Sequence, residues 1–177
     1  MIYAGFGKRL AANLVDIFVF LPFGITRVLL FPHSHVWTFV TIVLSPLLIL
    51  AYYIFCHARW GQTLGKRAVG IRVVKVSGER LTWREAILRS LVDVVLTFFY
   101  ILIMTPILFP NLEALWLQWV IAFSSLWVIK LDILGQVWFW SELVTMLFNK
   151  KKRALHDFIA GTVVIQEQVA TLEHPST

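Results

Sequence analysis

The chain has 177 residues, carries a formal net charge of +6, and is 59% hydrophobic and only 15% charged. An ordinary soluble domain carries about 25% charged residues, so this composition excludes a soluble globular fold. Several apolar runs reach the ~20 residues that an α-helix needs to cross a bilayer, which predicts an integral membrane protein. We expect one membrane domain over residues 1–167 and a polar tail over residues 168–177.

Basic residues outnumber acidic ones, and most of the 16 lie beside apolar runs, in segments 8–9, 59–89 and 150–153. The positive-inside rule places such segments in the cytoplasm, so we expect both termini there. Membrane topology therefore explains the charge, and we expect no nucleic-acid partner. The expected partners are the lipid bilayer of a bacterial inner membrane and anionic lipid head groups at its cytoplasmic face.

About four membrane-spanning helices are expected, so the predicted fold is all-α, a polytopic membrane helix bundle. The first span covers about 11–31 and the second about 36–56. The third covers about 87–109 and follows residues 82–85, whose Thr-Trp-Arg-Glu sequence is a capping box that favours the start of a helix.

Two further apolar segments lie within residues 112–148. If both crossed the membrane, the basic segment 150–153 would lie outside, which the positive-inside rule disfavours. We therefore expect 112–128 to lie at the outer interface and 130–148 to form the fourth span.

Two short stretches outside the spans have the composition of β-strands. Val69–Val76 ends at a Ser-Gly turn, and Gly161–Ile165 is rich in β-branched residues. Neither strand is stable alone, so we expect them to pair with each other beneath the membrane as a small cytoplasmic two-strand element.

Asp16 lies within the first apolar run, where a carboxylate costs roughly 2.5–3.5 kcal/mol and so needs a partner. Arg9, seven residues earlier, lies on the same helix face but about 10 Å away along the axis. Each of the two therefore needs another partner. Asp157 follows the last basic segment and lies at the same boundary as Arg9. It either balances the basic residues beside it at a helix end or pairs with Arg9. No partner for Asp16 is identified from the sequence.

Asp93 and Glu142 are two further acids at membrane depth in the predicted spans. His156 and Asp157 are adjacent, so in a helix their side chains point about 100° apart and do not form a dyad. The residues show no hydrolytic constellation, and we expect no catalytic site, cofactor site or metal site. The protein is therefore not expected to be an enzyme.

The segment from Gly61 through Gly65 to Lys66 resembles a phosphate-binding loop only superficially. It has three residues between the glycines instead of four, and Arg67 stands where serine or threonine would bind magnesium. We interpret the glycines as tight backbone turns. The loop is either a structured segment near anionic lipid heads or a functional gate.

Three segments in this order, 7–16, 61–74 and 153–164, resemble the motifs of the RDD family of membrane proteins, which is named for an arginine and two aspartates. By this resemblance Arg9 is the arginine, Asp16 the first aspartate and Asp157 the second, with Asp93 as the alternative. The resemblance also implies a role associated with transport.

Two functions are compatible with these residues. In the first, intramembrane acids exchange a cation for a proton, which in a protein of four spans would need a homo-oligomer. In the second, the chain is a membrane interaction or assembly module, and the arginine and aspartates are structural.

Overall fold

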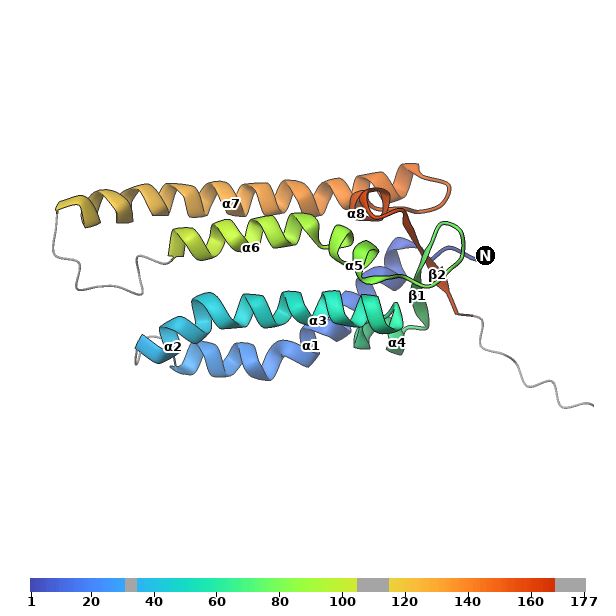
Figure 1. The fold of residues 1–177 in the computed structure, drawn as a ribbon, viewed down its shortest axis with the longest axis horizontal. Helices are drawn as coiled ribbons and strands as arrows, with labels where there is room; N and C mark the ends of the chain where they lie inside the picture. The colour runs from blue at the N-terminus through green and yellow to red at the C-terminus, as the bar shows by residue number, and fades with distance from the viewer. Residues whose placement is uncertain (31–34, 105–114, 168–177) are drawn as a thin grey trace, which may run out of the picture.

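A computed structural model of the chain describes residues 1–30, 35–104 and 115–167. Four helices, α1, α3, α6 and α7, run along its length, and a small sheet lies at the end that also holds the N-terminus (Figure 1). The elements in chain order are α1 (Phe6–Leu30), α2 (His35–Phe39), the π-helix η1 (Val40–Leu44), α3 (Ser45–Trp60), α4 (Leu64–Ala68), β1 (Ile71–Lys75), α5 (Trp83–Arg89), α6 (Leu91–Met104), α7 (Leu115–Phe148), α8 (Leu155–Ile159) and β2 (Thr162–Gln166).

The fold is mostly helical with one two-stranded antiparallel sheet. Among the described residues, the helix over Val40–Trp60 is long and apolar enough to cross a membrane by itself. A second candidate is the pair Trp83–Arg89 and Leu91–Met104, if the two bent helices form one broken span.

The second expected span is helical, and its start differs from a regular α-helix. Residues Val40–Leu44 form a π-helix, and Pro46 is the second residue of α3, which follows it. Proline lacks an N–H group, and its ring clashes with the carbonyl four residues earlier, so a wider turn relieves the conflict. The hydroxyl of Ser45 donates to the carbonyl of Thr41 at 2.8 Å. The helix then continues to Trp60, beyond the predicted end.

The third expected span begins earlier than predicted and is bent. The capping box is present, with the Thr82 N–H donating to Glu85 at 2.8 Å, so α5 starts at Trp83. A break at Ser90 then turns the chain by 59° into α6. The described helix ends at Met104, and residues 105–109 of the prediction lie outside the described residues.

The predicted division of residues 112–148 is wrong from residue 115 onward. One helix, α7, runs without a break over 34 residues, Leu115–Phe148, which corresponds to about 51 Å. The prediction rested on charge and span length, but residues 126–134 contain no proline, glycine or cap that would end a helix. Residues 112–114 lie outside the described part of the chain.

The predicted strand pair is confirmed. Strand β1 pairs antiparallel with β2, and Val73 lies opposite Val164 in the register. The N-terminus adds an interaction that the sequence did not predict, because the Ala4 N–H donates to the Val164 carbonyl at 2.9 Å and Tyr3 bridges to Ile165. Three segments distant in sequence therefore meet at one end of the molecule.

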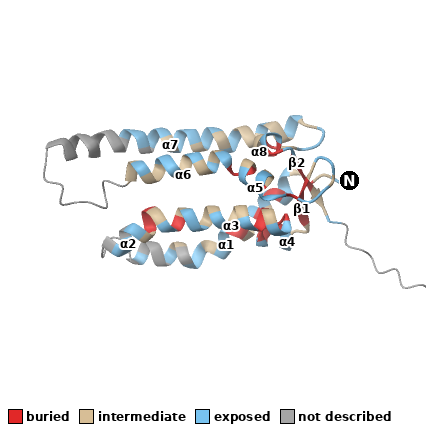
Figure 2. Ribbon diagram, viewed as in Figure 1, coloured by how far each residue is buried: buried red, intermediate tan, exposed pale blue. Residues whose placement is uncertain are grey.

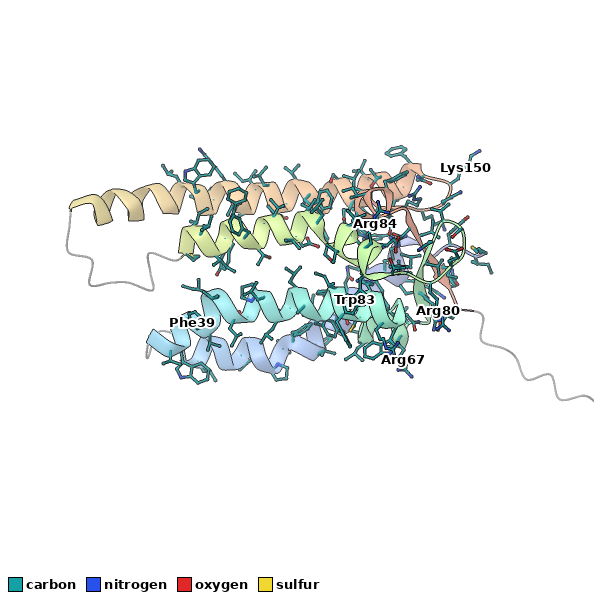
Figure 3. All side chains as sticks on the ribbon, viewed as in Figure 1. Phe39, Arg67, Arg80, Trp83, Arg84 and Lys150 are labelled. Atoms are coloured by element: carbon teal, nitrogen blue, oxygen red, sulfur yellow. The ribbon has the colours of Figure 1, made fainter. Side chains whose placement is uncertain are left out.

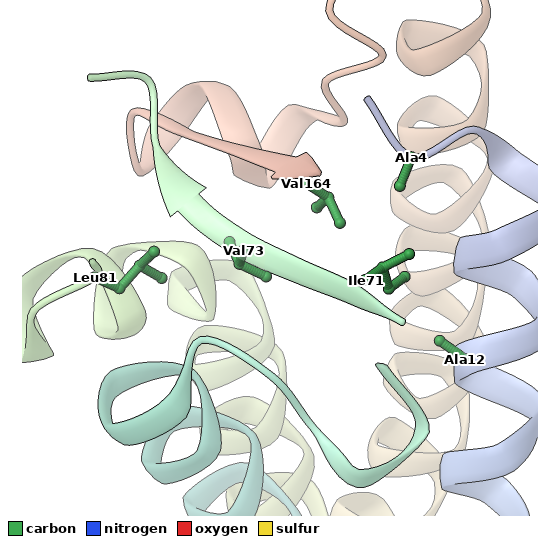
Figure 4. Close-up of a cluster of buried hydrophobic side chains, with 6 residues drawn as sticks. All are labelled: Ala4, Ala12, Ile71, Val73, Leu81 and Val164. Atoms are coloured by element: carbon green, nitrogen blue, oxygen red, sulfur yellow. The ribbon is translucent and has the colours of Figure 1, made fainter. Parts of the chain in front are cut away.

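Buried residues concentrate at the sheet end of the molecule, and the long helices expose apolar side chains along most of their length (Figure 2). The core cluster joins both strands, the N-terminal segment and α1 (Figure 4); it comprises Ala4, Ala12, Ile71, Val73, Leu81 and Val164. This core fixes the sheet against the start of α1.

Replacing Ile71 with alanine should lower the free energy of unfolding by about 2–5 kcal/mol, because the fully buried side chain fills the centre of the core cluster. Thermal unfolding in detergent measures the change. Val76→Ala is the matched control, since that side chain is 42% exposed and its loss should change stability by less than about 0.5 kcal/mol. Equal effects of the two substitutions would contradict a core at the sheet.

Candidate functional site

Asp157 is fully buried and lies between two guanidinium groups. Its Oδ2 accepts a hydrogen bond from Nη1 of Arg9 at 2.7 Å, and its Oδ1 accepts one from Nη1 of Arg89. The hydroxyl of Thr162 donates to Oδ1 at 3.2 Å and the Ala154 N–H donates to Oδ2 at 3.0 Å. The contact between Arg9 and Asp157, one of the two alternatives from the sequence, is thus present.

Local structure explains how Asp157 reaches this position. Asp157 lies in the first turn of α8, where its carboxylate accepts the N–H of Ala154 at the helix start. The guanidinium of Arg153 donates to the Thr162 carbonyl at 3.0 Å and to the Asp157 carbonyl at 2.9 Å, which ties α8 to β2. Burial alone would raise the pKa of Asp157, but Arg89, His156 and Arg9 outweigh it and hold that pKa well below its usual range.

Arg89 is the partner that sequence reasoning missed. It was considered only as a basic residue at the edge of the third span, but it is buried at the last turn of α5. The break at Ser90 directs the end of α5 towards α8. The signal available in the sequence was an arginine seven residues after the capping-box threonine, at the edge of an apolar run.

His156 connects this ion-pair cluster to α7. Its Nδ1 contacts Oε1 of Glu142, and its Nε2 lies 2.7 Å from Nη2 of Arg89. Burial and then the charge of Arg89 lower the pKa of His156, which favours a neutral ring that donates to Glu142 and accepts from Arg89. Nε2 lies 3.6 Å from Asp157 Oδ1, beyond hydrogen-bond distance, so the two adjacent residues form no dyad. We call Arg9, Arg89, Glu142, His156 and Asp157 the Asp157 network.

Asp16 occupies a second buried site, and the structure supplies the partners that the sequence left unnamed. Its Oδ1 accepts the Gly65 N–H at 2.8 Å and the Tyr52 hydroxyl at 3.0 Å, and its Oδ2 accepts the Thr63 hydroxyl at 2.6 Å. The Tyr52 hydroxyl in turn accepts the Leu64 N–H at 2.9 Å. Three donors from the loop and α3 thus satisfy the carboxylate, and Asp16 fixes the start of α4 against α1.

The two loop glycines are required by close backbone contacts. A Cβ on Gly65 would lie 2.9 Å from the Ala12 carbonyl carbon and 2.9 Å from Cγ of Asp16. Gly61 ends α3 with φ of +68°, and a Cβ there would lie 2.7 Å from the Val73 carbonyl oxygen. The interpretation of these glycines as tight turns therefore agrees with the geometry.

Lys66 is buried beside His57, with its Nζ 2.9 Å from Nε2 of the ring. Burial and then the charge of Arg89 lower the pKa of Lys66 to about 7. A lysine in this position takes up and releases a proton near neutral pH.

A cavity of about 600 Å³ opens between α1, α3, α6 and α7. Its charged and titratable lining residues are Arg9, His57, Lys66, Arg89, Asp93, Glu142 and His156. Asp93 forms no ion pair with the described residues, and neither Asp16 nor Asp157 lines the cavity. Asp16 and Asp157 are thus enclosed by hydrogen bonds, whereas Asp93 and Glu142 face the cavity. We call this cavity the acid cavity.

Within the described residues, no group of three or more His, Cys, Asp or Glu side chains is placed to hold a metal ion. His33 and His174 lie outside those residues.

The RDD family model matches residues 3–161. The chain belongs to the RDD family. This RDD protein is 25% identical over 178 aligned residues to the "Uncharacterized membrane protein YteJ" of Bacillus subtilis (strain 168), an alignment that covers 94% of this chain and 83% of the relative. No solved structure matches it. Family and relative together identify a membrane protein.

Arg9 contacts Asp157 and makes no ion pair with Asp93 among the described residues. Asp93 instead lies on α6 at the acid cavity.

Asp157→Asn should lower the free energy of unfolding by about 3–5 kcal/mol, because two buried guanidinium groups lose their carboxylate. Arg9→Met in the same chain should cost less than the sum of the two single changes, since it removes one of the stranded charges. Thermal unfolding of the two single variants and the double variant measures the coupling. If the changes in the free energy of unfolding of the two single variants simply add in the double variant, the contact between Arg9 and Asp157 contributes nothing to stability.

Gly65→Ala should reduce the amount of folded protein strongly, because backbone atoms of α1 occupy the position of the new methyl group. Gly7→Ala is the control, since no atom lies within 4 Å of a Cβ there and alanine is the better helix former. Fluorescence-detected size-exclusion chromatography of tagged variants compares the two. Normal levels of Gly65→Ala would contradict the close approach of α4 to α1.

Proposed function

We propose that α1, η1 with α3, α5 with α6, and α7 are four membrane spans, and that both termini and the sheet lie in the cytoplasm of a bacterial inner membrane. Two observations support this orientation. The N-terminus and the sheet lie at the same end of the molecule (Figure 1). The basic segments 8–9, 59–89 and 150–153 flank the elements at that end, as the positive-inside rule requires. We also propose that the protein is not an enzyme.

We further propose that this protein exchanges a monovalent cation for a proton at the acid cavity. The observation that carries this proposal is a cavity of about 600 Å³ that two carboxylates, Asp93 and Glu142, share with the titratable Lys66. Intramembrane acids that face a cavity are typical of ion pathways. Two carboxylates suit a cation that keeps part of its water shell, and the described residues offer no three-ligand site for a divalent ion.

Lys66 supplies the coupling. With a pKa of about 7, it is an ammonium below that pH and a neutral amine above it. The ammonium adds a third positive charge to the cavity beside Arg9 and Arg89, which repels a second cation. Loss of the proton removes that charge, and a cation can then bind near Asp93 and Glu142. Cation binding and proton binding therefore exclude each other.

In this proposal Asp16 and Asp157 do not carry the ion. Both are fully buried and accept hydrogen bonds from the chain itself. Asp16 holds the loop after α3 against α1, and Asp157 holds α8 against α1. These contacts keep Arg9 and Lys66 at the wall of the acid cavity.

Proteoliposomes with an imposed sodium or potassium gradient and an internal pH dye test the proposal. Proton movement by the wild-type protein should depend on the cation and be greatest near pH 7, where Lys66 both binds and releases a proton. Asp93→Asn and Glu142→Gln should each abolish it by removing a carboxylate that binds the cation, and Lys66→Met should abolish it by removing the group that binds the exchanged proton.

Asp132→Asn is the matched control, since Asp132 lies on α7, is exposed and does not line the acid cavity. Its flux should equal that of the wild type. Equal flux from Asp93→Asn, Glu142→Gln and the wild type, at equal amounts of reconstituted protein, would end the exchange proposal.

The enclosed acids favour a second candidate, a membrane interaction or assembly module. Asp16 and Asp157 are satisfied by the chain itself, and the long helices expose apolar faces that could pack against another copy. This candidate predicts no flux from the wild type, a homo-oligomer in lipid nanodiscs, and loss of abundance in Asp16→Asn. Flux from the wild type with cation dependence would decide against it.

A further inference from the structure

A second hollow, of about 650 Å³, lies on the sheet side of the molecule, between the end of α3, α4, β1 and the loop before α5. Four arginines line it, namely Arg59, Arg67, Arg72 and Arg80. Its volume is in the range of ligand pockets. We call it the arginine pocket; neither Arg9, Asp16 nor Asp157 lines it.

Three of its arginines have no partner among the described residues. Arg59, Arg67 and Arg80 are exposed and form no hydrogen bond or ion pair with the described residues. Figure 3 shows Arg67 and Arg80 at the sheet end on the side of α4, whereas Lys150 lies on the side of α7. Guanidinium groups that line one pocket repel one another, which costs electrostatic free energy. An anion bound between them would offset this repulsion.

The fourth arginine is held in place by the protein. Nη2 of Arg72 lies 2.6 Å from the carboxylate of Glu167 and donates to Oε1 of Gln62 at 3.2 Å. Gln62 is itself fixed, because its amide donates to the Ile71 carbonyl at 2.9 Å. Nε of Arg72 is buried and has no hydrogen-bond partner among the described residues. One donor of an arginine that lines the pocket therefore has no partner among the described residues.

Aromatic residues indicate the depth of the pocket in the membrane. Trp60 and Trp83 are each 55% exposed, and the rings of both lie beside Phe55, at centroid distances of 5.3 and 6.1 Å. Tryptophan is enriched at the level of lipid head groups. Trp60 also lines the arginine pocket, so the pocket opens at the head-group level.

We propose that the arginine pocket binds a phosphate-bearing anion, and that the phosphate is presented by an anionic phospholipid of the surrounding leaflet. Arginine forks bind phosphate oxygens in pairs, which lysine does not do. The pocket supplies four guanidinium groups against one carboxylate, Glu167. Trp60 and the exposed Leu64 lie where the acyl chains of such a lipid begin.

Thermal unfolding in a neutral detergent tests the proposal with three additions at equal phosphate concentration: phosphatidylglycerol, phosphatidylcholine and inorganic phosphate. Phosphatidylglycerol should raise the Tm of the wild type by at least about 3 °C over phosphatidylcholine. A triple variant, with Arg59→Gln, Arg67→Gln and Arg80→Gln, should lose this difference.

A matched triple variant, with Arg84→Gln, Lys150→Gln and Lys151→Gln, changes the net charge equally on exposed residues outside the pocket and should keep the difference. If the first triple variant is unfolded without added lipid, the single variants Arg67→Gln and Arg80→Gln replace it.

Each outcome decides the proposal. Stabilisation by phosphatidylglycerol alone, lost only in the pocket variant, supports a lipid phosphate. Equal stabilisation by inorganic phosphate, again lost only in that variant, supports the phosphate site with a soluble ligand and overturns the lipid source. If both triple variants lose the stabilisation by phosphatidylglycerol equally, or if neither loses it, the proposed phosphate site is wrong.

Discussion

The buried carboxylate of Asp157 is the interaction on which the sheet end of the molecule depends. It joins α8 to Arg9 on α1 and to Arg89 on α5. Two guanidinium groups and one carboxylate leave one positive charge in excess, and neutral His156 connects them to the second carboxylate, Glu142. The whole Asp157 network thus holds opposite charges in equal number. Loss of any charged member would leave a buried charge without compensation, which costs several kcal/mol.

Asp16 serves a different purpose from Asp157. Hydrogen-bond donors, and no ion pair within the described residues, satisfy its carboxylate: one backbone N–H and two hydroxyl groups. It acts on the backbone of the loop after α3 and holds α4 close to α1. That placement carries Lys66 to the wall of the acid cavity. One aspartate therefore joins side chains, and the other positions a loop.

Sequence reasoning predicted the features that depend on local pattern and charge. The strand pair followed from β-branched composition, and the pairing of Arg9 with Asp157 was one of two alternatives that followed from their common boundary. It missed the partners of Asp16, because Thr63 and Tyr52 are uncharged. The spacing of residues along the chain also does not indicate that the loop after α3 packs against α1. The sequence prediction also missed the continuity of α7. The positive-inside rule constrains how many segments cross the membrane, but it does not indicate at which residue a helix ends.

The pairing of the N-terminus with β2 constrains how the chain can reach its native state. The Ala4 N–H donates to the Val164 carbonyl, and Arg9 pairs with a residue 148 positions later. Arg9 therefore lacks its carboxylate partner until the chain has been synthesised as far as residue 157. Contacts of such sequence separation form slowly. A chain that stops before residue 157 cannot form this ion pair, nor the contact of the N-terminal segment with β2.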